Sequence, residues 1–214
     1  KNKMPEVCEK TAMCTMFNDW LIYKMTGVFS SEPSNACTTG IFDLKARDWD
    51  DQIAASIGLK TGIFPKISEC GTVVAQVGAK GAAETGLAEG TPVVAGGGDA
   101  QLGCVGVGVV DANQAAIFGG SFWQYEYNTD EAKTDEHCRV RVNCHSVPGI
   151  WQYEALAFKP GMVMRWYRDA FCQYEKELSK TTGRDPYDLM NEKAKDIPAG
   201  CYGMMCAFSD VMNY

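Results

Sequence analysis

The sequence has no long hydrophobic run and no excess of positive charge. No stretch of about 18 or more apolar residues occurs, so no segment is expected to cross a bilayer. The 27 acidic residues outnumber the 20 lysines and arginines, and the formal net charge is −7. This charge would repel a nucleic acid or an anionic membrane, and neither is expected as a partner. The polar start, Lys1–Lys10, does not predict a secretory signal peptide.

Two common phosphate-binding motifs are also missing. The chain contains no GxGxxG dinucleotide fingerprint and no P-loop with its Gly-Lys-Ser/Thr ending. No internal repeat or low-complexity segment is evident. Any nucleotide site must therefore be of another type.

Cysteine, by contrast, is plentiful. Ten cysteines are scattered through the chain, and several stand among apolar neighbours, for example Cys104, Cys172 and Cys206. A buried free thiol packs as a small hydrophobic group. Disulfides persist in oxidising compartments and are rare in the cytosol, so this distribution predicts a reducing, cytoplasmic location.

Hydrophobic periodicity predicts an α/β protein, because helical and strand patterns alternate. Helices are expected at residues 11–27, 49–57, within 79–90, and at 100–110, 161–180 and 186–196. Strands are expected at residues 71–77, 91–95, 114–118, 122–127, 139–143 and 150–156, the last two as partners. A domain boundary is expected near residues 108–114.

The most informative turn is GGGDAQ, which starts at Gly96 and follows the strand TPVVA. Its glycines allow positive φ and close approach of a ligand to the backbone. Asp99 would lie at the carboxyl end of a strand, where open α/β sheets bind ligands and where a general base is well placed. The alternative is that Asp99 only caps the following helix.

A second turn, GGSF, begins at Gly119 and follows the strand QAAIF. Its backbone amides and the Ser121 hydroxyl can contact a phosphate. A plain hairpin turn is the alternative. We expect the two glycine-rich turns to end adjacent core strands, with Asp99 and Ser121 near a common cleft.

Four potential zinc ligands, His137, Cys138, Cys144 and His145, occur close together in EHCRVRVNCH. Five residues with strand alternation separate the two pairs, and the usual short CxxC or HxxxH spacing is missing. No metal site is therefore predicted among them.

Together, these segments resemble the FGGY family of carbohydrate kinases, in family order and over nearly the whole chain. The matching segments are DWLIYKMTG (19–27), SNACTTGIFD (34–43), ETGLAEGTPVVAGGGDAQLGCVGVG (84–108), GGSFWQ (119–124), CHSVPGIWQ (144–152) and MRWYRD (164–169). Four segments are most similar to the members that phosphorylate a small quorum-sensing dihydroxy-diketone: GGGDAQLGC (96–104), GGSFWQ (119–124), RWYRDAFCQYEK (165–176) and FSDVMNY (208–214).

The resemblance implies an actin-like ATPase (ribonuclease H-like) fold with two α/β domains. Residues 1–110 would form the C-terminal part of the first, substrate-side domain. Residues 111–214 would form the N-terminal part of the second, nucleotide-side domain. The family's Asp-Gly-Thr phosphate loop and its glycine-rich adenosine motif are not found, so we expect an internal part of a longer protein, inactive alone.

The resemblance also implies roles for single residues. Asp99 matches the family's catalytic base, and Gln101 and Gly98 match positions that contact the substrate. The loop of Gly119, Gly120 and Ser121 matches the second domain's phosphate-contacting turn. The implied cofactors are ATP and Mg²⁺.

The implied reaction is ATP-dependent phosphorylation of a primary hydroxyl on a small sugar-like substrate. A kinase for a pentulose or polyol such as xylulose is the alternative within the family. A sugar- or nucleotide-binding module without turnover is the alternative from another class. Homo-oligomerisation is left open.

All ten cysteines should be free in the native protein, because they are dispersed through apolar segments. A thiol titration under denaturing, non-reducing conditions should therefore count ten thiols. A count of eight or fewer would show that at least one disulfide is present.

Overall fold

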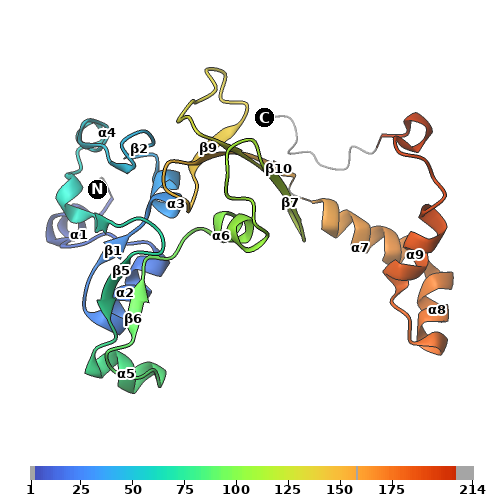
Figure 1. The fold of residues 1–214 in the computed structure, drawn as a ribbon, viewed down its shortest axis with the longest axis horizontal. Helices are drawn as coiled ribbons and strands as arrows, with labels where there is room; N and C mark the ends of the chain where they lie inside the picture. Colours follow the sequence, from blue (N-terminus) through green and yellow to red (C-terminus); the bar gives the residue numbers. More distant parts are fainter. Residues whose placement is uncertain (1–2, 158, 206–214) are drawn as a thin grey trace. The chain divides into compact units, whose positions relative to one another are not determined.

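The computed structural model describes residues 3–157 and 159–205, which form two compact units (Figure 1). Unit 1 is drawn from Lys1–Ala116 and Glu126–Glu154, and unit 2 from Ile117–Tyr125 and Ala155–Tyr214. The segment 208–214, which contributes to the family resemblance, lies outside the described residues. These two compact units do not test whether residues 1–110 and 111–214 belong to two different domains of the family. That assignment stays a prediction.

Unit 1 begins with short helices and short strands in alternation. Its helices are α1 (Pro5–Lys10), α2 (Phe17–Thr26), α3 (Pro33–Ala36), α4 (Asp51–Ser56), α5 (Ala79–Thr85) and α6 (Asp99–Gly106). Its first strands are β1 (Ser30–Ser31), β2 (Phe42–Asp43), β3 (Asp48–Trp49), β4 (Lys66–Ile67), β5 (Val73–Gln76) and β6 (Pro92–Val94). The 3-10 turns are Cys37–Thr39, Thr61–Ile63 and, in unit 2, Cys201–Gly203.

The strands form three small sheets and one larger sheet. Parallel β1 and β4 form one pair, and the antiparallel pairs are β2 with β3 and β5 with β6. The larger sheet has the order β7-β8-β10-β9, from β7 (Ala115–Gly119), β8 (Trp123–Thr129), β9 (Arg141–Cys144) and β10 (Trp151–Ala157). Strands β9 and β10 are antiparallel, which confirms the pairing predicted for residues 139–143 and 150–156.

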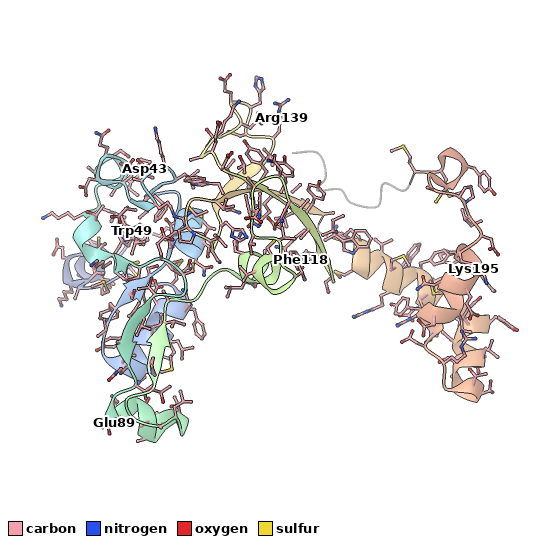
Figure 2. All side chains as sticks on the ribbon, viewed as in Figure 1. Asp43, Trp49, Glu89, Phe118, Arg139 and Lys195 are labelled. Atoms are coloured by element: carbon pink, nitrogen blue, oxygen red, sulfur yellow. The ribbon has the colours of Figure 1, made fainter. Side chains whose placement is uncertain are left out.

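Apolar side chains of unit 1 gather in two clusters. In the first, Ile22 of α2 packs against Val77 and Val93 beside the β5-β6 pair. In the second, Phe42 and Cys144 are buried. Trp49 (labelled in Figure 2) packs beside them, and its indole N–H donates to the Pro65 carbonyl at 2.7 Å. The second cluster brings β9 to the segment that follows α3.

Arg47 connects two parts of unit 1 that are distant in sequence. Its guanidinium donates to both carboxylate oxygens of Glu69 at 2.7 Å, and to the carbonyl oxygens of His145 at 3.0 Å and Ile150 at 3.2 Å. The connection between β9 and β10 is thereby fixed to the turn between β2 and β3. Bidentate, charge-assisted bonds of this kind are strong and directional.

Helix α2 is shorter than the periodicity of residues 11–27 predicts. The helix begins at Phe17 because the Asp19 carboxylate accepts the Met16 amide at 3.0 Å, which satisfies one of the donors that a helix start leaves unpaired. At the other end, Gly27 has φ of 78° and ends the helix as expected.

Unit 2 contains α7 (Pro160–Phe171), α8 (Gln173–Thr182) and α9 (Pro186–Ala194). The single helix predicted over residues 161–180 is therefore wrong. Cys172, with φ −104° and ψ 48°, leaves the helical region and divides it into α7 and α8. The apolar side chains of α7, including Met164, Trp166 and Phe171, are exposed in the part of the chain that the structure describes.

No helix among the described residues is long and apolar enough to cross a membrane. Nine of the ten cysteines lie in the described ranges, and all nine are free.

A glycine fixes the distance between α2 and α5. A Cβ atom on Gly81 would lie 2.2 Å from the Met25 carbonyl oxygen. Because this neighbour is backbone, it cannot rotate away. We expect Gly81→Ala to lower the free energy of unfolding by about 1–3 kcal/mol, as overpacking does, measured by urea denaturation.

The matched control is Gly106→Ala, also in a helix, where a Cβ would meet nothing within 4 Å. This change should leave stability unchanged or raise it by about 0.4–1 kcal/mol, since alanine restricts the unfolded chain. Equal stability of the two variants would contradict the close approach of α5 to α2.

Candidate active site

The GGGD turn lies where the sequence predicts it, between β6 and α6. Gly98 is the N-cap of α6 with φ −61°, and neither Gly96 nor Gly97 has positive φ. The expectation of positive φ is therefore wrong. Gly97 and Gly98 instead leave room for nearby side chains: a Cβ on Gly97 would lie 2.5 Å from the Ser146 hydroxyl oxygen, and one on Gly98 would lie 2.2 Å from Gln101 Oε1.

Asp99 is the first residue of α6 and is exposed. Its Oδ1 accepts the Ala100 amide at 2.8 Å. The N-cap position belongs to Gly98 and not to Asp99, so Asp99 is not the capping residue. Ala100, Gln101 and Cys104 are buried on the other side of the same helix. The fold thus presents the Asp99 carboxylate outward from an anchored helix.

Gln101, predicted to contact a substrate, is only 5% exposed. Its side-chain oxygen lies next to Gly98, so the side chain turns back against the glycine turn. Its role towards a substrate, like that of Gly98, stays a prediction.

Sequence reasoning missed Glu32. No helix was expected at SSEPSN, yet Glu32 is 1% exposed and caps α3. Ser34 connects this carboxylate to the GGGD turn: its hydroxyl donates to Glu32 Oε2 at 2.6 Å and accepts the Gly98 amide at 2.8 Å. The local signal was an acidic residue before Pro-Ser-Asn, which is typical of a helix start.

A layer of buried polar side chains from β8 and β10 lies close to α6. Gln152 Nε2 donates to Asn128 Oδ1 at 3.0 Å and to the Cys104 sulfur of α6 at 3.1 Å. Asn128 in turn donates to the Val109 carbonyl at 3.2 Å. Hydrogen bonds of this kind satisfy buried amides and hold α6 at a defined position on the strands.

Glu126 and Glu154 are two buried carboxyl groups in this layer. Burial, the neighbouring Glu154 and the charge of Asp99 together raise the pKa of Glu126 to about 8. Arg141 Nη1 lies 3.5 Å from Glu154 Oε1. Glu126 is therefore mainly protonated at neutral pH, and its charge state responds to Asp99.

The GGSF turn belongs to unit 2 and joins β7 to β8. The Gly120 amide donates to the Phe122 carbonyl at 2.8 Å, so the hairpin geometry is present, and Ser121 is exposed. A Cβ on Gly161, in the first turn of α7, would lie 1.8 Å from the Gly120 carbonyl oxygen. The turn therefore rests directly on the start of α7.

We expected the two glycine-rich turns to end adjacent strands. This expectation is wrong. Strand β6 pairs with β5, whereas β7 pairs with β8 in another sheet. Asp99 lies in unit 1 and Ser121 in unit 2, and a common cleft stays a prediction.

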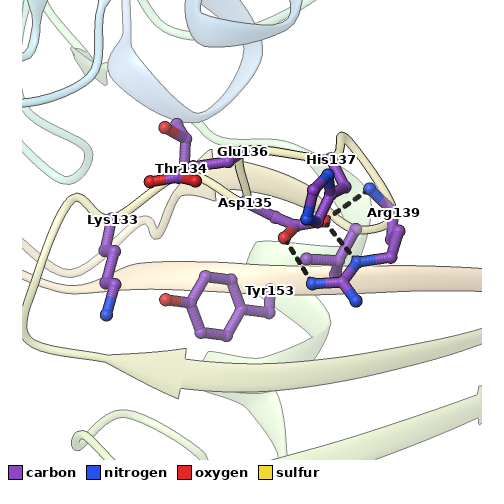
Figure 3. Close-up of a pocket in the computed structure, with 8 residues that line it drawn as sticks. Lys133, Thr134, Asp135, Glu136, His137, Arg139 and Tyr153 are labelled. Carbon is purple, nitrogen blue, oxygen red and sulfur yellow. Dashed lines mark hydrogen bonds and ion pairs between the residues drawn. The ribbon is translucent and has the colours of Figure 1, made fainter.

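The four potential zinc ligands separate into two environments. His137 and Cys138 are exposed on the loop between β8 and β9, which lines a cavity of about 530 Å³ (Figure 3). Cys144 and His145 are buried. Burial lowers the pKa of His145 to about 4. Within residues 3–157 and 159–205, no three His, Cys, Asp or Glu side chains are grouped to hold a metal ion.

The loop itself is closed by an ion pair. Arg139 donates to both carboxylate oxygens of Asp135, at 2.8 and 3.0 Å, and holds the pKa of that carboxyl group well below its usual range (Figure 3). The ion pair thereby joins two positions of the loop that are four residues apart.

Protonation of Glu126 predicts a pH dependence of stability. Between its ordinary pKa of 4.5 and the folded-state value of about 8, the folded protein binds more protons than the unfolded chain. The free energy of unfolding should therefore fall as pH rises through this range, by at most about 1.4 kcal/mol per pH unit. Glu126→Gln should remove this decline, measured by urea denaturation from about pH 6.5 to 8.

His145, whose pKa is lowered to about 4 in the folded state, opposes this decline only near the acid end of the range, because an unfolded-state histidine still binds part of a proton at pH 6.5 and almost none by about pH 7.5. The exposed Glu89→Gln variant serves as the control and should keep the wild-type slope. A wild-type protein whose stability is flat or rises from pH 6.5 to 8 would contradict a neutral Glu126.

Comparison with known proteins shows the family to which this chain is related. Residues 1–106 match the family model for the FGGY family of carbohydrate kinases, N-terminal domain. Autoinducer-2 kinases from Enterobacter sp. (strain 638) and Klebsiella pneumoniae subsp. pneumoniae are 46% and 45% identical over 210 residues, 98% of this chain. Those residues are 40% of each relative, so the chain spans about 40% of the length of the curated relatives it matches.

A solved structure of a ligand-bound xylulose kinase from Lactobacillus acidophilus superposes with a TM-score of 0.78. Its sequence is 22% identical, and the match covers 94% of this chain and 39% of that one. At this identity the likeness shows the fold alone, and it confirms the predicted α/β, actin-like ATPase fold of the sugar kinases. From the family model over its first half and the relatives across nearly its whole length, the chain belongs to the FGGY family of carbohydrate kinases.

Proposed function

We propose that the complete protein containing this chain phosphorylates a primary hydroxyl of a small sugar-like substrate with ATP, and that Asp99 is the general base. The observation that carries this proposal is the exposed Asp99 carboxylate at the start of α6, directly after β6 and the glycine turn. A general base must reach the proton that it takes, and this position leaves the carboxylate open to a ligand.

The proposed substrate is the quorum-sensing signal autoinducer-2. The curated relatives that are 45–46% identical are named autoinducer-2 kinases, whereas the xylulose kinase structure is only 22% identical. A pentulose or polyol such as xylulose is the second candidate, because proteins with that name share the fold.

In the proposed reaction the substrate hydroxyl oxygen attacks the γ-phosphorus of ATP. The O–H proton passes to the Asp99 carboxylate, a new P–O bond forms, and the bond to the ADP oxygen breaks. In this class of reaction the protein mainly positions the reactants and stabilises charge. An oriented base contributes by accepting the proton as the oxygen attacks.

The Gly119–Ser121 turn is the proposed contact for ATP phosphate. It is exposed, and the close packing of Gly161 against Gly120 holds its backbone at the start of α7. Helix starts and clustered backbone amides favour anions. For Mg²⁺ the described residues offer no group of three suitable ligands, so no residue is assigned to it.

Residues 1–110 and 111–214 are proposed to belong to the substrate-side and nucleotide-side domains of the family. The chain contains neither the Asp-Gly-Thr loop nor the adenosine motif, and we expect no turnover from residues 1–214 alone. A cytoplasmic location is proposed from the nine described free thiols.

The decisive variant is Asp99→Asn in the complete protein. Asparagine is nearly isosteric and still hydrogen-bonds to the hydroxyl, so KM for the substrate should change little. It cannot accept the proton, and kcat should fall by about 10²–10⁴-fold. Steady-state phosphorylation of autoinducer-2 and xylulose by ATP measures both constants and ranks the two substrates.

A variant that retains more than roughly a tenth of wild-type kcat would fall short of the general-base range and return Asp99 to a structural role. Wild-type protein that binds autoinducer-2 or ATP without forming product would favour the non-catalytic binding module instead. Calorimetric binding measured on the same samples separates these outcomes.

A further inference from the structure

Glu32 is a buried carboxylate with an unusually complete set of donors. Its Oε2 accepts the Ser34 amide and the Ser34 hydroxyl, both at 2.6 Å, and the Cys70 thiol at 3.3 Å. Its Oε1 accepts from Asn35 twice, from the amide at 3.1 Å and from Nδ2 at 2.5 Å. A buried charge is tolerated only when it is paired or fully hydrogen-bonded, so these five donors account for its presence.

The donors of Glu32 fix the direction of the next hydrogen bond. A hydroxyl has one proton, and that of Ser34 is used by Glu32. The Ser34 oxygen must therefore act as an acceptor towards Gly98, whose amide lies 2.8 Å away. Asn35 Oδ1 also lies beside Gly98, 3.6 Å from the position of a Cβ there. Ser34 thus contacts the N-cap of α6 directly, and Asn35 lies beside it.

Gly98 is joined to Asp99 by one peptide bond, so the hydrogen bond that fixes the Gly98 amide also limits the movement of Asp99. Gly98 and Ser34 are buried and Asp99 is exposed, so the hydrogen bond anchors the helix start from inside and leaves the carboxylate outside. A base misplaced by about 1 Å can lose about 10²-fold in rate, because the reacting atoms must be held in line. An acceptor that is itself fixed by a carboxylate provides that precision.

We propose that Glu32 and Ser34 are positioning residues that hold Asp99 at the site of proton transfer, acting through the Gly98 amide. This inference rests on the proposed function, in which Asp99 is the base. The proposed site then includes two further residues, from a segment that lies more than sixty positions before Asp99 in the chain.

The primary test is Ser34→Ala in the complete protein, with Ser30→Ala as the matched control. Ser30 is likewise buried, at 3% exposure, but its hydroxyl donates to Ser68 at 3.0 Å and not to the catalytic turn. We expect Ser34→Ala to lower kcat about tenfold, within the range that misplacement causes, with KM for ATP unchanged. Ser30→Ala should stay within about twofold of wild type.

A second measurement separates positioning from a general structural role. If Ser34 acts through Asp99, Ser34→Ala should cost nothing further in an Asp99→Asn background, because the two changes remove one interaction. Equal losses for Ser34→Ala and Ser30→Ala, or a full additional loss in the Asp99→Asn background, would overturn the proposal. If Ser34→Ala does not fold, Ser34→Cys replaces it, since a thiol keeps the volume and is a poor acceptor.

Hydrogen exchange of the Gly98 amide tests the same contact without any activity. Loss of the Ser34 acceptor should speed exchange at Gly98 in Ser34→Ala and leave it unchanged in Ser30→Ala. Unchanged exchange in Ser34→Ala would refute the positioning contact. Inactive wild-type protein in which Ser34→Ala speeds Gly98 exchange would instead refute the proposed function and leave the contact established.

Discussion

The hydrogen bond from the Gly98 amide to the Ser34 hydroxyl is the constraint on which the arrangement around Asp99 depends. It exists because a buried carboxylate, Glu32, must collect donors, and the nearest ones belong to the next turn of chain. Satisfying Glu32 orders Ser34, and Ser34 then has only acceptor capacity left for Gly98. The start of α6 is thus determined by electrostatics in a distant segment.

Two carboxyl groups near α6, those of Asp99 and Glu126, lie in different environments. Asp99 faces outward at the start of the helix. Glu126 lies in the buried polar layer near the helix, and burial together with Glu154 and Asp99 raises the pKa of Glu126 to about 8. A protonated Glu126 adds no second negative charge near Asp99.

Local features of this site could be predicted from sequence, and long-range ones could not. TPVVA followed by GGGD predicts a strand, a turn and a helix, and β6 and α6 confirm it. The sequence before Pro33 marks Glu32 as a helix start, but its connection to α6 could not be predicted, because it runs through Ser34 to the Gly98 amide, which is far along the chain. The break at Cys172 was missed for a related reason: its neighbours favour a helix, and periodicity does not register a single non-helical residue.

The glycine turns show how such motifs should be interpreted. A glycine-rich turn suggests positive φ, yet Gly96, Gly97 and Gly98 all avoid it. At Gly97 the missing Cβ makes room for Ser146, and at Gly161 it makes room for the carbonyl of Gly120. At Gly97 the close neighbour is a side chain, which can shift, whereas at Gly161 it is backbone. A side chain at position 161 would therefore displace the GGSF turn from the start of α7.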